Sequence, residues 1–428
     1  MPQWCSKVFP TPPADLATVL GKLQIEDAFE ALHRNWRLSQ RSFCKDSLFF
    51  LEPDSVRGVC QAIRMSDQVS EVLLRSLSFF EEHPEARRLA WHFHVLLFRR
   101  SDRKPPIAGG WPMLPESLGE GALLFYVYIL LSGFHYIKDF HYRRGIPEEV
   151  TLDTLADLEL WIREYRRLHG RWGLREYGWL YRHFLGRLYK LGRLQFEMAR
   201  FHLDYHAFRN RSNQRVVVLA GQGMRFRRDG QFNGANGIED SEGTWTGEFS
   251  NEDGVVRGCP ISPKGFALRE SATLLLDEWE EILKIHDPTL AVHIDAGGPM
   301  DHTACGDSMR GALEFFPQHF PEHRFRAFTC DSWLMDNQLA DHLPEESNIV
   351  RFLREFYLLP LEGASDRQTM ERVFDGPLRD LDSAPQRTSL QRAIIRHMKA
   401  GGCWRESAGV IFPERSNWGK PKPGREFF

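Results

Sequence analysis

The spacing of apolar residues changes partway along the chain, and this change limits the folds that the sequence can adopt. Up to about residue 187, apolar side chains recur at intervals of three and four, for example at Leu16, Val19, Leu20 and Leu23. This spacing places them on one face of an α-helix. Beyond residue 187, short β-branched runs such as QRVVVLAG are typical of strands and alternate with helical stretches. We therefore expect an α+β fold, with a helical N-terminal domain followed by a mixed-sheet C-terminal domain.

Cap residues and a polar break predict the organisation of the first part. Asp15 and Ser66 each precede a run with helical spacing and are predicted to be N-caps. A later helix is predicted to end at Gly170, because glycine tolerates the left-handed backbone that often follows a helix. The segment RRGIPEEVT is polar and carries Gly and Pro, which favours a boundary near residue 150. We predict a helical domain over residues 1–150 and a second domain over residues 151–428.

The second domain is predicted to alternate strands and helices around an insertion rich in turns. Turn signals at Asn236-Gly237 and Asp253-Gly254 predict β-hairpins or a long loop around residues 221–265. Strands are predicted in LGRLQFE, over residues 290–295, in HRFRAFTCDSWL and in SAGVIF. Helices are predicted in SATLLLDEWEEILKIH, over residues 307–320 with Asp307 or Ser308 as N-cap, in NQLADHLPEESNIVRFLREF and in SLQRAIIRHMKAGG.

The charge balance argues against a nucleic-acid partner. The chain carries 55 Lys and Arg against 58 Asp and Glu, so its net charge of −3 creates no field that attracts a polyanion. Basic residues between positions 163 and 193 do interleave with Trp and Tyr, a pattern also found in nucleic-acid-binding proteins. We interpret this stretch as amphipathic helices with solvated cationic faces, and contact of one or two Arg with the phosphates of a small ligand is the alternative.

Cysteine usage and hydropathy indicate a cytoplasmic protein with no membrane partner. Seven cysteines are scattered without a CxxC pair, which argues against a zinc ribbon or a disulfide framework and for a reducing compartment. The first residues lack the basic and apolar regions of a signal peptide. The apolar stretch 121–140 is interrupted at Ser132, Gly133 and His135 and falls short of the roughly 20 residues of a spanning helix, so we predict a buried core helix.

Four stretches of the chain resemble a known protein family. LGRLQFE, VHIDAGGPMD, CDSWLMDNQLADHLPEESNIVRF and HMKAGGCWRESAGVIF look like the signature stretches of an uncharacterised bacterial acyltransferase family. Its members join a helical N-acyltransferase N-terminal domain to a GNAT-like C-terminal domain. The resemblance covers most of the chain, and it implies transfer of an acyl group from acyl-CoA, as co-substrate, to an amine of a small molecule. It supplies neither the acyl group, nor the acceptor, nor the oligomeric state.

The resemblance also implies where the co-substrate binds. In folds of this type the acyl thioester lies against the open end of the strand at residues 290–295, and the next loop and helix N-terminus face the CoA pyrophosphate. On this basis we expect cofactor contacts from Ile294, Ala296, Gly297, Gly298, Ser308 and Asn348. The usual phosphate-binding pattern of the superfamily, Gln/Arg-x-x-Gly-x-Gly/Ala, is absent from this loop, and its nearest match, QFNGAN at residues 231–236, is interpreted as a hairpin turn. A non-catalytic protein that binds acyl-CoA or another small molecule is therefore the main alternative.

Several side chains are candidates for the chemistry, because attack of an amine on a thioester needs a base for the amine and an acid for the thiolate. His293 is the first candidate for the base, since imidazole titrates near neutral pH, and Asp295 shares its face of the strand. Glu197 is a second carboxylate candidate. Cys330 and Ser332 are candidates to protonate the thiolate or to bind the acyl oxygen. The structural alternatives are a half-buried strand residue for His293, a turn-stabilising carboxylate for Asp295 and a small buried residue for Cys330.

Metal chemistry is a third alternative. His293 and Asp295 match the first two ligands of the His-x-Asp…His iron site of metal-dependent oxygenases. The later histidines, however, lie in or beside helical stretches instead of on the distant strand that such a site needs. His202 and His206 have the spacing of a helical pair but lack the Glu of the HExxH zinc motif. We therefore expect no resident metal ion.

Overall fold

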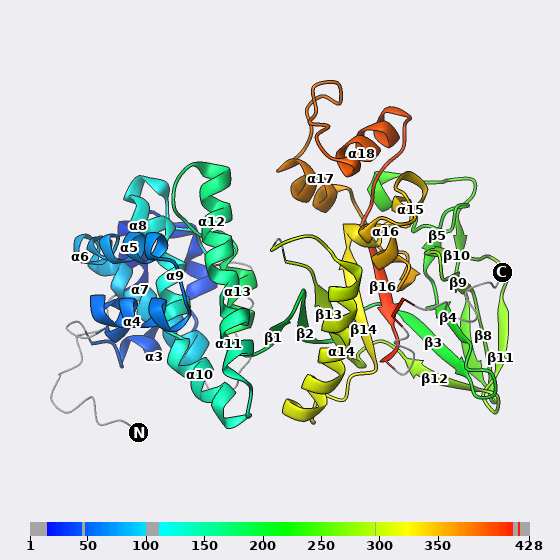
Figure 1. Cartoon of the computed structure of the whole chain (residues 1–428), viewed down its shortest axis with the longest axis horizontal. Helices are drawn as coiled ribbons and strands as arrows, with labels where there is room; N and C mark the ends of the chain where they lie inside the picture. The colour runs from blue at the N-terminus through cyan, green and yellow to red at the C-terminus, as the bar shows by residue number, and fades with distance from the viewer. Residues whose placement is uncertain (1–14, 45–47, 100–110, 296, 414–417, 420–428) are drawn as a thin grey trace. The chain divides into compact units, whose positions relative to one another are not determined.

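The computed structural model describes residues 15–44, 48–99, 111–295, 297–413 and 418–419 (Figure 1). Contacts between residues divide the chain into two compact units, Met1–Lys190 and Leu191–Phe428. The first is helical and the second contains mixed sheets, which confirms the predicted α+β class. The division lies later in the chain than residue 150, because helices α11 (Glu148–Leu155), α12 (Asp157–His169) and α13 (Tyr177–Phe184) pack with one another and with earlier helices.

Local sequence signals set the helix ends in the first unit. The side chain of Asp15 accepts a hydrogen bond from the N–H of Thr18, and that of Ser66 from the N–H of Val69, so both predicted N-caps are confirmed. Gly170 ends α12 in the left-handed conformation, as predicted. The earlier helices are α1 (Leu16–Lys22), α2 (Phe29–Leu32), α3 (Trp36–Gln40), α4 (Pro53–Ala62), α5 (Asp67–Arg75), α6 (Ser78–Glu82), α7 (Pro84–His94), α8 (Glu120–Leu123), α9 (Phe125–Leu131) and α10 (Phe134–Arg143).

The apolar segment 121–140 lies in the interior of the helical unit. It runs through α8, α9 and α10, and every residue of α9 is buried, so the predicted core helix is confirmed as a series of shorter helices. Glycine at position 133, where α9 and α10 are divided, has a packing reason, since a Cβ there would lie 2.3 Å from Cζ of Phe98. In the part of the chain that the structure describes, no helix combines the length and the apolar character needed to cross a bilayer.

The basic stretch 163–193 makes ion pairs and ring contacts. Arg163 Nε lies 2.6 Å from Glu159 Oε1 within α12. The guanidinium of Arg166 lies 4.1 Å from the ring centre of Trp172, and that of Arg182 lies over Trp179. These contacts agree with amphipathic helices that carry their cationic side chains at the surface.

The larger sheet contains the strands predicted in LGRLQFE, over residues 290–295, in HRFRAFTCDSWL and in SAGVIF, whereas QRVVVLAG forms a strand of the second sheet. Its order is β1–β2–β13–β14–β16–β15. β13 runs antiparallel to β2 and parallel to β14, and the long helix α14 (His302–His319) connects β13 to β14 (Figure 1). The strands are β1 (Leu188–Leu191), β2 (Leu194–Arg200), β13 (Pro288–His293), β14 (Ala327–Ser332), β15 (Tyr357–Leu359) and β16 (Ser407–Ile411).

A second sheet of the same unit, with the order β10–β9–β4–β3–β12, shares an apolar core with the first. The core joins Tyr205, Val218 and Ile261 of this sheet to Tyr357 and Val410 of the larger one. Its strands are β3 (Tyr205–Asn210), β4 (Val216–Ala220), β9 (Pro260–Ser262), β10 (Phe266–Ala267) and β12 (Trp279–Leu283). Smaller sheets pair β5 (Arg225–Phe226) with β6 (Trp245–Thr246), and β8 (Val255–Gly258) with both β7 (Phe249–Glu252) and β11 (Ala272–Leu275).

Of the two turns predicted in the 221–265 region, one forms a β-hairpin and the other does not. β7 and β8 form a hairpin around Asp253-Gly254, whose φ angles of 52° and 78° fit the tight turn that twisted hairpins prefer. Asn236-Gly237 instead ends a short 3₁₀ turn, Ala235–Gly237. QFNGAN therefore leads into a 3₁₀ turn within the long loop that joins the antiparallel strands β5 and β6, instead of forming a hairpin turn itself, and it begins no α-helix.

The helix predicted in SATLLLDEWEEILKIH is wrong. This segment forms β11 and β12, because its residues pair with strands that are distant in sequence. Glu281 of β12 lies opposite Phe208 of β3, and its Oε1 is 2.8 Å from Nδ1 of His206. Cross-strand pairs of this kind override a helical pattern of acidic residues.

The predicted start of the helix after the Gly-Gly-Pro turn is also wrong. α14 begins at His302 with Asp301 as N-cap, and Asp301 Oδ1 accepts the N–H of Ala304 at 2.8 Å. Asp307 and Ser308 lie inside the helix, beyond Gly306, a residue type that usually favours a helix end. The helix predicted in NQLADHLPEESNIVRFLREF is divided near Pro344 into α15 (Leu339–His342) and α16 (Asn348–Leu353), whereas α18 (Ser389–Lys399) forms as predicted after α17 (Arg367–Phe374).

Candidate active site

Strands β13 and β14 separate before β13 ends. Their parallel pairing runs from Thr289 opposite Ala327 to Ala291 opposite Thr329 and stops there. On its other edge, β13 stays paired with β2 as far as His293, and β14 stays paired with β16 as far as Ser332. We call this place the β13–β14 divergence. Beyond Ala291 and Thr329, β13 and β14 no longer pair with each other, although each keeps its other neighbour.

His293 and Glu197 meet across β2 and β13 beside the divergence. Glu197 lies opposite Ala291 and His293 opposite Gln195, so the two form a diagonal pair on one face of the sheet. His293 Nε2 is 3.4 Å from Glu197 Oε2, and the side chains retain 30% and 17% of their exposure. Both residues are candidates from the sequence, and the structure brings them together. A carboxylate at this distance can orient an imidazole ring.

Asp331 lies across the divergence from His293. If the register of the last β13–β14 pairs is continued, His293 and Asp331 fall opposite each other, and their side chains keep the same face. Asp331 Oδ2 is 3.2 Å from Nε2 of His202, which is 65% exposed. Surrounding protein atoms raise the pKa of Asp331 by desolvation, and the imidazoles of His202 and His293 oppose this rise. Glu197, His293, Asp331 and His202 thus form what we call the His–carboxylate array.

The sequence reasoning missed two members of the array. Asp331 stands between Cys330 and Ser332, which were selected because a strand emerges there, but alternation puts both on the opposite face of β14 from Asp331. Selecting Asp331 requires the pairing of β14 with β13, which puts it opposite His293 and which the sequence alone does not supply. His202 was considered with His206 for a metal, yet β3 begins between them and each binds a different acid.

Asp295 and Arg193 fasten the turn that follows β13. Arg193 Nη1 donates to Asp295 Oδ1 at 3.0 Å, and the same oxygen accepts the N–H of Gly297 at 2.9 Å. The guanidinium also donates to the carbonyl oxygens of Asp295, Gly298 and Pro299. Asp295 therefore has the turn-stabilising position that was its structural alternative.

The other cofactor candidates lie at the end of β13 and beyond it. Ile294 is half-buried, Gly297 and Gly298 are exposed, and Ala296 lies outside the described residues. Asn348 is the first residue of α16, and Ser347 before it is the N-cap.

Ser308 serves the structure of the unit. It is 3% exposed, and its hydroxyl accepts the N–H groups of Arg193 and Leu194 and donates to the carbonyl of Ala304. These bonds tie α14 to the start of β2. The hydroxyl is thus committed inside the protein instead of capping a helix that faces a cofactor.

Cys330 and Ser332 have local roles at the end of β14. Cys330 is 1% exposed, and burial raises the pKa of its thiol, so it stays neutral in agreement with the small buried residue that was its alternative. Ser332 is half-buried, and its Oγ accepts the N–H of Leu334 at 3.2 Å as the cap of a short 3₁₀ turn.

The geometry does not favour the iron-site interpretation. Asp295, its second ligand, is bound by Arg193. His206 binds Glu281 and stacks on Phe249 at 4.0 Å between ring centres. Over residues 15–44, 48–99, 111–295, 297–413 and 418–419, no three His, Cys, Asp or Glu side chains are placed to hold a metal ion together.

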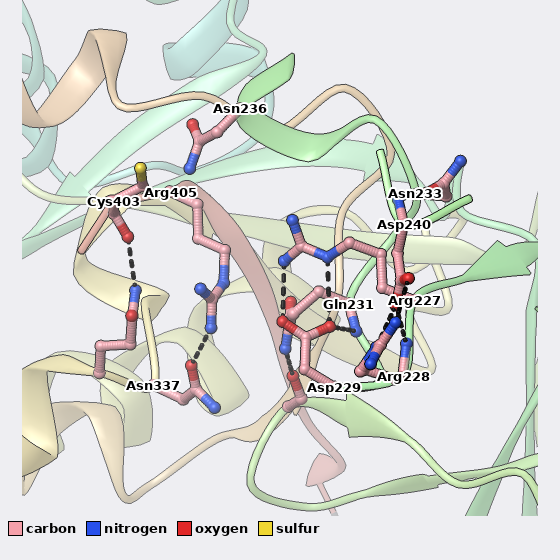
Figure 2. Close-up of polar contacts among 12 residues, drawn as sticks. Arg227, Arg228, Asp229, Gln231, Asn233, Asn236, Asp240, Asn337, Cys403 and Arg405 are labelled. Atoms are coloured by element: carbon pink, nitrogen blue, oxygen red, sulfur yellow. Dashed lines mark hydrogen bonds and ion pairs between the residues drawn. The ribbon is translucent and has the colours of Figure 1, made fainter. Parts of the chain in front are cut away.

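A second polar region lies in the loop between β5 and β6. Figure 2 shows Arg227 paired with Asp229, and Arg228 paired with Asp240 through Nε–Oδ2 and Nη2–Oδ1 distances of 2.7 and 2.8 Å. A hollow of about 580 Å³ opens beside this loop, lined by Arg228, Asp229, Glu242, Gly243, Trp245, Phe266, Ala267, Leu268 and Arg269. None of the candidate site residues lines it, and Arg228, one of its charged side chains, is paired within the loop.

Comparison with known proteins gives a consistent result. A family model described as the GNAT-like C-terminal domain matches residues 188–411, and one described as the N-acyltransferase N-terminal domain matches residues 54–186. No curated protein matches the chain. The solved structure of an acyltransferase in complex with decanoyl-CoA is 25% identical, with a TM-score of 0.63, and the match covers 93% of this chain and 99% of that one. An acyltransferase mutant with octanoyl-CoA, at 24% identity and a TM-score of 0.66, has the same coverage. So does an acyltransferase with decanoyl-CoA and teicoplanin, at 24% identity and a TM-score of 0.64.

Proposed function

The chain belongs to the acyltransferase family that joins an N-acyltransferase N-terminal domain to a GNAT-like C-terminal domain, and we propose that it transfers an acyl group from acyl-CoA to an amine of a small molecule. The observation that carries this proposal is the β13–β14 divergence, with His293 and Asp331 on one face beside it. Two of the structures that share this fold were solved with decanoyl-CoA and octanoyl-CoA, which supports acyl-CoA as the donor.

The divergence supplies what the donor needs. The edge of β13 at Val292 and His293, beyond its last pair with β14, can bind the amide groups of a pantetheine arm as an added strand would. The turn that follows ends at the N-terminus of α14, an 18-residue helix whose dipole favours an anion such as a pyrophosphate. Ile294, Gly297 and Gly298 lie between the two, and we keep them as cofactor-binding residues together with Ala296.

The array supplies the proton chemistry. His293 accepts a proton from the protonated acceptor amine, Glu197 orients the imidazole, and Asp331 passes this proton to His202, which contacts solvent. The neutral amine nitrogen then forms a bond to the acyl carbon, the carbon–sulfur bond breaks, and the departing thiolate takes up the second proton that the nitrogen loses as the amide forms. Asp331, whose pKa is raised by desolvation although its side chain is 35% exposed, lies near two imidazoles, an arrangement typical of functional sites.

The proposal is tested by binding and turnover in one experiment. Wild-type protein is incubated with acyl-CoA esters of increasing chain length, its melting temperature is recorded, and thiol release is followed with a panel of amines. We expect a stabilising shift with at least one ester, and thiol release that depends on an amine. His293→Ala should keep the shift and lose thiol release by on the order of 100-fold or more. His135→Ala, at an exposed histidine of α10, is the matched control and should match wild type.

The alternatives give different results. A shift with acyl-CoA but no thiol release with any amine would favour a non-catalytic binding protein, the alternative raised by the absent phosphate-binding pattern. No shift with any ester would overturn the proposal.

A further inference from the structure

The described part of the C-terminal segment, Trp418 and Gly419, sits on the first turns of α14. The indole N–H of Trp418 donates to the carbonyl oxygen of His302, the first residue of the helix, at 2.8 Å. The indole also stacks on the His302 ring, with 5.1 Å between ring centres, and contacts the ring of Phe352 in α16. The contact is therefore both polar and apolar.

Gly306 makes room for this indole. A Cβ at Gly306 would lie 2.5 Å from Cδ1 and 2.8 Å from Nε1 of Trp418, distances that neither the backbone nor a packed ring can accept. A glycine inside a helix destabilises it relative to alanine, so this position has a reason beyond helix formation. The docked tryptophan supplies that reason. Gly311 in the same helix is different, because nothing lies within 4 Å of a Cβ placed there.

A buried polar cluster lies beside the contact between Trp418 and α14. Arg351 donates to Nδ1 of His302 at 3.1 Å, and arginine can only donate, so Nε2 carries the proton that His302 shares with Glu355 Oε1 at 3.0 Å. Glu355 Oε1 also accepts the N–H of Gly419 at 2.9 Å. The side chains of His302 and Glu355 are 6% and 8% exposed. One carboxylate therefore links the start of α14, the region of α16 and the C-terminal segment.

We propose that Trp418 is a positioning residue for acyl-CoA: its docking fixes the first turns of α14 and, through them, the turn after β13. This inference rests on the proposed function, in which that turn and the N-terminus of α14 face the donor. Trp418 touches neither the array nor the divergence in the contacts above, so it acts on donor binding and leaves the proton chemistry unchanged. Loss of the docking should raise KM for acyl-CoA while kcat is kept.

Alanine at the two glycines of α14 gives the sharpest test. Gly306→Ala should expel the indole and raise KM for acyl-CoA by about tenfold, because small misplacements of binding groups weaken positioning. Gly311→Ala, in open space on the same helix, should leave KM within about twofold. Trp418→Ala should reproduce the Gly306→Ala effect. Trp418→Phe keeps a ring but loses the N–H donor, so its KM should lie between those of wild type and Trp418→Ala. The double variant Gly306→Ala/Trp418→Ala should have the same KM for acyl-CoA as either single variant, since both substitutions remove the same contact.

Hydrogen exchange provides a readout that needs no activity. The amides of residues 305–309 should exchange faster in Gly306→Ala and Trp418→Ala than in wild type and Gly311→Ala. Faster exchange with unchanged KM would overturn the positioning role, and unchanged exchange would overturn the docking itself. A failure of the proposed function is seen separately, because wild-type protein would then release no thiol before any substitution is made.

Discussion

Asp331 stands in the same relation to the last β13–β14 pair as His293 does, two residues beyond it, so both side chains face one side of the sheet where the strands part. A carboxylate on β14 and an imidazole on β13 therefore flank the β13–β14 divergence on the same face of the sheet. The partners of each residue continue outward, to Glu197 on one side and to His202 on the other. The pairing of β13 with β2 and with β14 sets the positions of Glu197, His293 and Asp331, and His202 lies just before the start of β3.

Asp331→Asn should lower activity and leave the fold at least as stable. The pKa of Asp331 is raised in the folded protein by desolvation, so the folded state binds the proton more tightly than the unfolded state does. The charged carboxylate therefore destabilises the fold once the pH exceeds its unfolded-state pKa, and the amide removes this cost. We expect kcat to fall by on the order of tenfold while the melting temperature at pH 7.5 stays equal or rises.

Two measurements decide this prediction. Thiol release and thermal unfolding are compared for wild type, Asp331→Asn and Asp277→Asn, an exposed acid between β11 and β12 that serves as the control. A large drop in melting temperature for Asp331→Asn would mean that the charge supports the fold, contrary to the argument from desolvation.

His202→Ala should slow turnover in a way that a small buffer base repairs. His202 is 65% exposed and 3.2 Å from Asp331, so an imidazole molecule from solvent can occupy its place. We expect kcat to fall by several-fold to about tenfold in dilute buffer and to recover as imidazole is added, with KM for acyl-CoA unchanged. Recovery is measured against wild type at the same imidazole concentrations. Full activity of His202→Ala in dilute buffer would remove His202 from the proton path.

Much of the site was predictable from local sequence, and the rest was not. The order strand, glycine turn, helix around residues 288–319 gave β13 and α14, and alternation placed His293 on a defined face. Glu197 was selected for its motif alone, because its contact with His293 depends on the pairing of β2 with β13, which are far apart in the chain. Asp331 was missed for the same reason. Where a long-range pair decides the structure, as at Glu281 and His206, local spacing even predicted the wrong element.

Arg193→Lys should weaken acyl-CoA binding although it keeps the charge. The guanidinium of Arg193 donates to the Asp295 carboxylate and to the carbonyl oxygens of Asp295, Gly298 and Pro299, a set that needs a planar fork of donors. An ammonium group cannot reach them all. We expect KM for acyl-CoA to rise by about tenfold with a smaller change in kcat, because the turn after β13 loses its shape.

The control for this substitution is Arg200→Lys. Arg200 ends β2, and its side chain donates a hydrogen bond, at 2.8 Å, to the carbonyl of His286, which lysine can replace. Steady-state kinetics of both variants compare the two positions directly. Equal KM values for Arg193→Lys and wild type would show that the turn does not contribute to donor binding.

Three buried histidines should make the helical unit sensitive to acid. His92, His94 and His141 are at most 6% exposed, and desolvation lowers their pKa values to about 4, 3 and 4. Each makes a 2.8 Å contact through Nδ1 with a buried hydroxyl, from Ser39, Ser132 and Thr151 respectively. The imidazoles are therefore held neutral inside the α7 and α10 region of the unit.

The sign of the pH effect follows from these pKa values. Because the unfolded chain, with histidine pKa values near 6.5, binds more protons than the folded one, the free energy of unfolding falls as the pH drops below about 6.5. At pH 5 each of the three histidines should cost about 2 kcal/mol relative to neutral pH. Thermal unfolding followed by helical circular dichroism at pH 7.5, 6.5 and 5 should show a steep fall, and His141→Gln should reduce its steepness whereas His135→Gln, at an exposed site, should not. A melting temperature that is constant across this range would mean that the buried imidazoles gain protons without loss of packing, which desolvation of this degree does not allow.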